Sequence, residues 1–187
     1  MNKLSQILEH NKMFVETQEY KKIVTDKYPD KKILVLGCMD TRLIELLPQA
    51  MNINNGDAKI IKNAGAIISE PFGQEMRSIA ISVYEFETDE IYIVGHHECG
   101  VRGLESDYII NKALSSGIDN ETIQMLKSSG IDLDKWLNGF DTVEESIKNS
   151  VKIVKEHPIM PKELIVHGLV MCPETGKLDV IVNGYNK

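Results

Sequence analysis

At 187 residues, the chain suits one domain large enough to bury a hydrophobic core, and its 42% hydrophobic and 26% charged content is ordinary for a soluble globular protein. The formal charge of −7 argues against nucleic acid as a partner, because phosphate binding needs a basic surface. No apolar run approaches the length that crosses a bilayer, no signal-peptide core follows the N-terminus, and three cysteines do not suggest a disulfide framework. We therefore expect a reduced, cytoplasmic protein without a membrane partner.

The first part of the chain is expected to be a helical arm. Apolar residues recur at helical spacing across residues 2–24 without an interrupting Pro or Gly, which predicts one helix or two short ones. The polar stretch that follows contains Pro29 and is typical of a linker. Residues 1–31 therefore form an arm and linker, and the arm packs either on its own domain or on a second subunit.

Strands and helices then alternate along the chain. The expected strands are 33–38, 59–63 and 90–95, and the expected helices between them are 41–51 and 73–87. Apolar residues of the first strand fall on both of its faces, as in a parallel strand that is buried on both sides. This alternation predicts a parallel sheet.

The second half of the chain is expected to add helices and two more strands. The helices are predicted at 106–116, 120–129 and 141–156, and the strands at 163–171 and 178–183. The link between these two strands is so short that it can only form a hairpin, so the fifth strand should run antiparallel to the fourth. The complete order predicts a single α/β domain spanning 1–187, with helices on both faces of a mostly parallel sheet.

Three potential metal ligands follow the ends of two predicted strands. Cys38 ends the first strand, and His96 and Cys99 follow the third. If the strand order is 2-1-3-4, these strands are neighbours at the point where ligands gather in such sheets. Two thiolates and one imidazole leave a fourth position open, which is the arrangement of a catalytic zinc site. The alternative, buried thiols beside an ordinary core histidine, does not explain the paired spacing.

A carboxylate and a guanidinium lie just beyond the first of these ligands. Asp40 and Arg42 are two residues apart, so they can form a rigid bidentate ion pair. Taken alone, they would equally fit a helix-capping aspartate next to a solvated arginine.

The two motifs together resemble a known signature. Cys38-x-Asp40-x-Arg42 followed by Gly95-His96-x-x-Cys99-Gly100 is similar to the zinc signature of the β-class carbonic anhydrases, and the length is closest to their compact prokaryotic type. The helical arm and the segments 58–65 and 166–169 also fit. The resemblance implies sheet order 2-1-3-4 with an antiparallel fifth strand. It also implies a homodimer or higher homo-oligomer in which the N-terminal helix embraces its partner.

The resemblance further implies a role for each site residue. Cys38, His96 and Cys99 would bind Zn²⁺. Asp40 would accept the proton of the nucleophile and orient it toward carbon dioxide, while Arg42 keeps Asp40 ionised and aimed. In closed forms of the family, the equivalent of Asp40 becomes the fourth zinc ligand and blocks catalysis. The expected activity is reversible hydration of carbon dioxide to bicarbonate and a proton.

Two other functions fit the same zinc ligands. One is hydrolysis of carbon disulfide or carbonyl sulfide, and the other is zinc or bicarbonate binding without catalysis. The Asp40–Arg42 pair argues against the second, because zinc binding alone needs neither residue. Three further residues receive ordinary interpretations: His97 as a solvated loop residue and not a proton shuttle, Cys172 as a core residue, and Lys59 as an edge-strand lysine.

Overall fold

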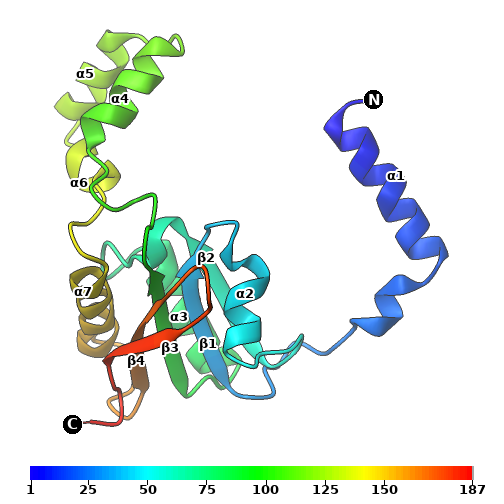
Figure 1. Ribbon diagram of the computed structural model, residues 1–187. Coiled ribbons are helices and arrows are strands. Elements are labelled where there is room, and N and C mark those ends of the chain that lie inside the picture. Colours follow the sequence, from blue (N-terminus) through cyan, green and yellow to red (C-terminus); the bar gives the residue numbers. More distant parts are fainter. Residues whose placement is uncertain (187) are drawn as a thin grey trace.

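A computed structural model describes residues 1–186, and its centre is one five-stranded sheet (Figure 1). The strand order is β2-β1-β3-β4-β5; β4 and β5 are antiparallel, and the other pairs are parallel. The strands are β1 (Ile33–Cys38), β2 (Ala58–Asn63), β3 (Glu90–His96), β4 (Ile165–Met171) and β5 (Leu178–Val182). The predicted fold class and strand order are therefore confirmed.

The helices follow the predicted order, with one addition. They are α1 (Lys3–Glu16), α2 (Leu43–Ala50), α3 (Gln74–Glu85), α4 (Ser106–Ser115), α5 (Asn120–Ser128), α6 (Leu133–Leu137) and α7 (Val143–Glu156), with short 3-10 helices η1 (Glu19–Lys22) and η2 (Ala64–Ala66). Helix α6 was not predicted from the sequence, because five residues are too few to show helical periodicity. The Asp132 side chain caps α6 by accepting a hydrogen bond from the Lys135 N–H at 2.9 Å.

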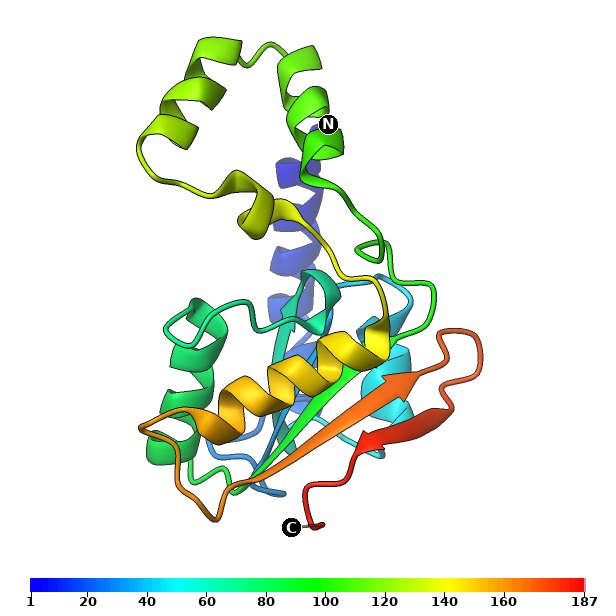
Figure 2. The same cartoon turned by 90° about the vertical axis from the view of Figure 1, so that its left-hand side faces the viewer.

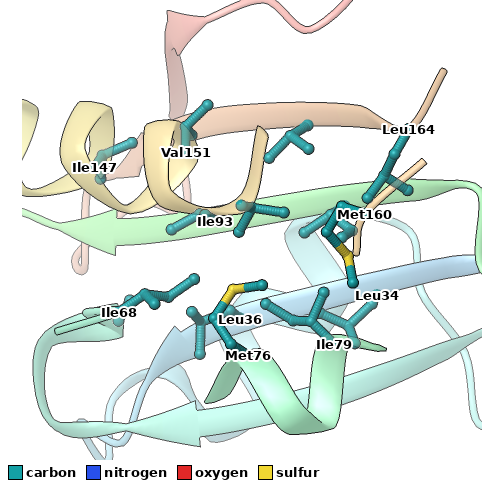
Figure 3. Close-up of a cluster of buried hydrophobic side chains, with 14 of the residues drawn as sticks. Leu34, Leu36, Ile68, Met76, Ile79, Ile93, Ile147, Val151, Met160 and Leu164 are labelled. Atoms are coloured by element: carbon teal, nitrogen blue, oxygen red, sulfur yellow. The ribbon is translucent and has the colours of Figure 1, made fainter. Parts of the chain in front are cut away.

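Helices cover both faces of the sheet, as predicted. On one face, α3 and α7 enclose the larger core: Figure 3 shows Ile147 of α7 above Ile93 of β3, and Met76 of α3 near Leu36 of β1. On the other face, α2 packs its buried Leu43 and Leu47 over β1. Successive strand residues point to opposite faces, so every side chain at the centre of β1 is buried.

The helix α7 lies very close to the sheet (Figure 2). A Cβ atom at Gly95 would lie 2.6 Å from Val143, and one at Gly168 would lie 2.4 Å from Ile147. Both glycines therefore allow α7 to approach the carboxyl end of β3 and the middle of β4 closely. This contact holds the carboxyl end of β3 in place, next to the end of β1.

Two parts of the chain extend away from the sheet. The arm helix α1 has no buried residue, so it does not pack on its own domain (Figure 1). Helices α4, α5 and α6 form a lobe with a small core of its own, made of Ile110, Ile123 and Leu133 (Figure 2). Within residues 1–186, no helix has both the length and the apolar character needed to span a membrane.

Candidate metal centre

The carboxyl ends of β1 and β3 bring the three predicted ligands together. These strands pair in parallel, with Gly37 opposite Val94, so Cys38 and His96 both lie at the same edge of the sheet. Cys99 returns to this edge through a tight turn in which Glu98 has a left-handed φ of 55°. The ligand atoms of Cys38, His96 and Cys99 lie within 4.8 Å of one another, and all three residues are buried.

The distances and hydrogen bonds of this group fit a metal ion. The sulfur atoms of Cys38 and Cys99 are 3.8 Å apart, too far for a disulfide bond. Two thiolates each about 2.3 Å from a tetrahedral Zn²⁺ would be separated by about 3.8 Å. His96 Nδ1 lies 2.8 Å from the carbonyl oxygen of His97, which leaves Nε2 buried and without a hydrogen-bond partner among residues 1–186. Such an atom costs about 1–3 kcal/mol unless a ligand binds it.

The two thiols do not ionise independently. Their mutual hydrogen bond is the largest influence on both: it lowers the pKa of Cys38 and raises the pKa of Cys99. Cys38 also accepts a hydrogen bond from the Gly65 N–H at 3.4 Å, which further favours its thiolate. The two thiols therefore titrate as one pair, and binding of a metal requires both of them as thiolates.

Asp40 and Arg42 form the bidentate pair that the sequence allowed. Arg42 Nε donates to Asp40 Oδ1 at 3.0 Å, and Nη2 donates to Oδ2 at 2.9 Å. The backbone N–H of Arg42 also donates to Oδ1, at 2.9 Å. The Arg42 guanidinium and this N–H together lower the pKa of Asp40 to about 2. Asp40 Oδ2 lies 3.8 Å from His96 Nε2, so the ionised carboxylate borders the space between the three ligands.

Arg42 also joins the two motif loops to each other. Its Nη2 donates to the carbonyl oxygen of Glu98 at 3.2 Å, and its Nη1 lies 3.5 Å from the Glu98 carboxylate. The turn between His96 and Cys99 therefore helps to fix the guanidinium that orients Asp40. The sequence did not predict this contact, because it depends on the backbone conformation of Glu98.

Other residues considered in the sequence lie elsewhere. His97 is exposed and lines a cavity of about 270 Å³ that also reaches His96. Cys172 follows β4 and is only half-buried, so its expected place in the core is wrong. Lys59 donates to the Lys27 carbonyl at 2.5 Å and lies over the Phe86 ring, as an edge-strand lysine can. By contrast, Lys62 contacts the Cys38 loop, which sequence reasoning missed.

The fold and this constellation of side chains are those of a carbonic anhydrase of the β class. A family model described as "Carbonic anhydrase" matches residues 33–178. The chain belongs to the β-carbonic anhydrase family.

Curated relatives and solved structures agree with this membership. The chain is 55% identical over 185 residues to a Bacillus subtilis (strain 168) protein named "Putative carbonic anhydrase YvdA", covering 99% of this chain and 94% of that one. It is 30% identical over 157 residues to a carbon disulfide hydrolase of Acidithiobacillus thiooxidans, covering 80% and 76%. The crystal structure of β-carbonic anhydrase isoform I from Trichomonas vaginalis superposes with a TM-score of 0.89 at 37% identity, covering 99% of this chain and all of that one.

Proposed function

We propose that the protein catalyses the zinc-dependent, reversible hydration of carbon dioxide to bicarbonate and a proton. The observation that carries this proposal is the Asp40–Arg42 pair beside the three converging ligand atoms. Retaining a metal would require only Cys38, His96 and Cys99. The ionised Asp40 carboxylate, which Arg42 holds in one orientation beside the three ligand atoms, adds a group that can orient a nucleophile.

Neighbouring backbone groups support two of the three ligand residues, His96 and Cys38. Cys38, His96 and Cys99 would hold Zn²⁺, which when bound supplies a Lewis acid that makes water nucleophilic near neutral pH. The Nδ1–H of His96 donates to the His97 carbonyl, so Nε2 is the free nitrogen that faces the site. The Gly65 N–H stabilises the Cys38 thiolate.

Asp40 would accept a hydrogen bond from the nucleophile and aim it at carbon dioxide. Because its pKa is about 2, Asp40 is ionised at any working pH and acts as an acceptor. Arg42 holds the carboxylate in one orientation through two parallel bonds. This is the open arrangement; in a closed arrangement, Asp40 would instead become the fourth ligand of the metal.

We further propose that residues 1–187 form one cytoplasmic domain that works as a homodimer or higher homo-oligomer. The arm, residues 1–31, supports this proposal, because α1 exposes Leu4, Ile7 and Leu8 at helical spacing and buries nothing on its own chain. A second subunit would cover this apolar face.

A second candidate activity is hydrolysis of carbon disulfide or carbonyl sulfide at the same site. It is favoured by the relatives named carbon disulfide hydrolase, such as the one that is 30% identical to this chain. A binding protein without activity is disfavoured by the intact Asp40–Arg42 pair.

The test is stopped-flow carbon dioxide hydration on protein of measured zinc content, with sulfide release from carbon disulfide measured in parallel. We expect one Zn²⁺ per chain and rapid hydration, and we expect Cys38→Ser to lose both. If zinc is stoichiometric and only sulfide is released, the second candidate replaces the first. If neither reaction exceeds the buffer rate, the protein binds zinc without catalysis.

A further inference from the structure

The Lys62 ammonium contacts both ends of the loop that carries Asp40 and Arg42. Lys62 is the penultimate residue of β2, directly opposite Gly37 of β1. Its Nζ donates to the carbonyl oxygen of Cys38 at 3.3 Å and to that of Leu43 at 3.1 Å. These two carbonyls flank residues 39–42, so a single side chain spans the loop.

The other hydrogen bonds of the loop do not span it in this way. Its first residue is tied to β2, because the Met39 N–H donates to the Asn63 carbonyl at 2.8 Å. Two later backbone bonds are internal: the Leu43 N–H donates to the Asp40 carbonyl at 3.0 Å, and the Arg42 N–H donates to the Asp40 side chain. The Arg42 guanidinium bonds outside the loop, to the Glu98 carbonyl, but it does not connect the two ends of the loop. The Lys62 bonds therefore set the separation between the two ends of the loop.

The charge environment of Lys62 supports a role in binding backbone carbonyls. The side chain is half-buried, and no carboxylate forms an ion pair with it within residues 1–186. Burial lowers its pKa, while the nearby Cys38 thiolate and Asp40 carboxylate oppose this shift. A half-buried ammonium without an acidic partner must satisfy its hydrogen bonds elsewhere, and here it does so through the two carbonyls.

We propose that Lys62 is a positioning residue that holds the 39–42 loop so that Asp40 stays paired with Arg42. Asp40 Oδ2 already lies 3.8 Å from His96 Nε2, so a short movement of a released loop would carry the carboxylate into the space for the metal. Lys62 thereby favours the open, active arrangement over the closed one. This inference rests on the proposed function.

The test compares Lys62→Met, which keeps an unbranched apolar stem but removes the ammonium and its donors, with Lys62→Arg, which keeps charge and donors. The matched control is Lys59→Met, on the same strand but bonded to Lys27 and not to the loop. We measure amide hydrogen exchange at Arg42 and Leu43 by NMR, with and without zinc, together with kcat, KM and zinc content. A variant such as Lys62→Gln, too short to reach both carbonyls, serves in the same way if Lys62→Met does not fold.

We expect Lys62→Met to speed exchange at these two amides about tenfold and to lower kcat about tenfold, a change in barrier of about 1.4 kcal/mol. KM and zinc content should stay unchanged, Lys62→Arg should recover most of the rate, and Lys59→Met should match the wild type. The proposal is overturned if Lys62→Met has the same amide exchange rates and kcat as the wild type. It is also overturned if the variant loses zinc in proportion to its loss of activity. If the wild type itself shows no hydration, the proposed function fails, whereas the exchange rates still decide whether Lys62 holds the loop.

Discussion

Replacing Arg42 with methionine should reduce catalysis strongly while affecting the stability of the protein only slightly. The substitution removes both side-chain bonds to Asp40, at 3.0 and 2.9 Å, and the bond to the Glu98 carbonyl at 3.2 Å. It leaves Cys38, His96 and Cys99 untouched. We therefore expect Arg42→Met to keep its zinc but to lose the orientation of Asp40.

The two expected effects differ in size. The Arg42 side chain is 42% exposed, so solvent screens the ion pair, and its loss should lower Tm only slightly. An orienting carboxylate contributes about 100-fold to rate, or about 2.7 kcal/mol of barrier. Expressed as free energies, the rise in the activation barrier should therefore exceed the loss in the free energy of unfolding.

The pKa of Asp40 should also rise from about 2 toward its ordinary value of 3.8 in Arg42→Met. A lowered carboxyl pKa contributes stability that is fully present above the ordinary value and is lost as the pH falls toward 2. The stability difference between wild type and variant should thus be constant above about pH 5 and shrink below about pH 4.

Stopped-flow kinetics, zinc analysis and carbon-13 NMR titration of the Asp40 carboxyl measure these effects. The control is Arg77→Met, which removes an exposed arginine from α3, away from the site. Arg42 does not orient Asp40 if Arg42→Met keeps its zinc and a kcat within about threefold of wild type, or if Asp40 still titrates near pH 2.

Three further outcomes are expected. Gly65→Ala places a side chain at a φ of 86° and 3.1 Å from Phe140, so it should destabilise the protein by about 2 kcal/mol or more in thermal unfolding. Gly103→Ala has a φ of 65° but no neighbour within 4 Å, so it should cost only about 1–2 kcal/mol, and equal losses would contradict the close contact at Gly65. Removing zinc with a chelator should lower Tm reversibly, because His96 Nε2 is left without a partner; an unchanged Tm would argue against a metal here. Two thiolate ligands offset the charge of Zn²⁺ and so weaken it as a Lewis acid. The rate of carbon dioxide hydration should therefore climb as the pH rises above neutral, and a rate that is flat from about pH 6 to 9 would contradict this.

The sequence predicted those features that depend on pattern and topology. Residues 33–38 form a strand with the expected bounds, because a continuous apolar run is followed by polar loop residues. The meeting of Cys38 with His96 and Cys99 followed from the parallel pairing of adjacent strands, which places their carboxyl ends together.

Contacts between side chains and the backbone could not be predicted in this way. The bonds from Lys62 to two carbonyls, from Gly65 to Cys38, and from Arg42 to Glu98 depend on strand register and loop conformation. These have no periodic signal in the sequence. The position of Cys172 was wrong for a similar reason: β4 ends at Met171, and the following turn leaves the thiol half-buried.

The most direct test of the central claim, that Asp40 makes a metal site catalytic, is carbon dioxide hydration by Asp40→Asn at matched zinc content. Asparagine keeps the size of the side chain but removes its charge and its ion pair with Arg42. We predict one Zn²⁺ per chain in both proteins and a kcat about 100-fold lower in the variant. Equal rates at equal zinc content would contradict the role assigned to Asp40.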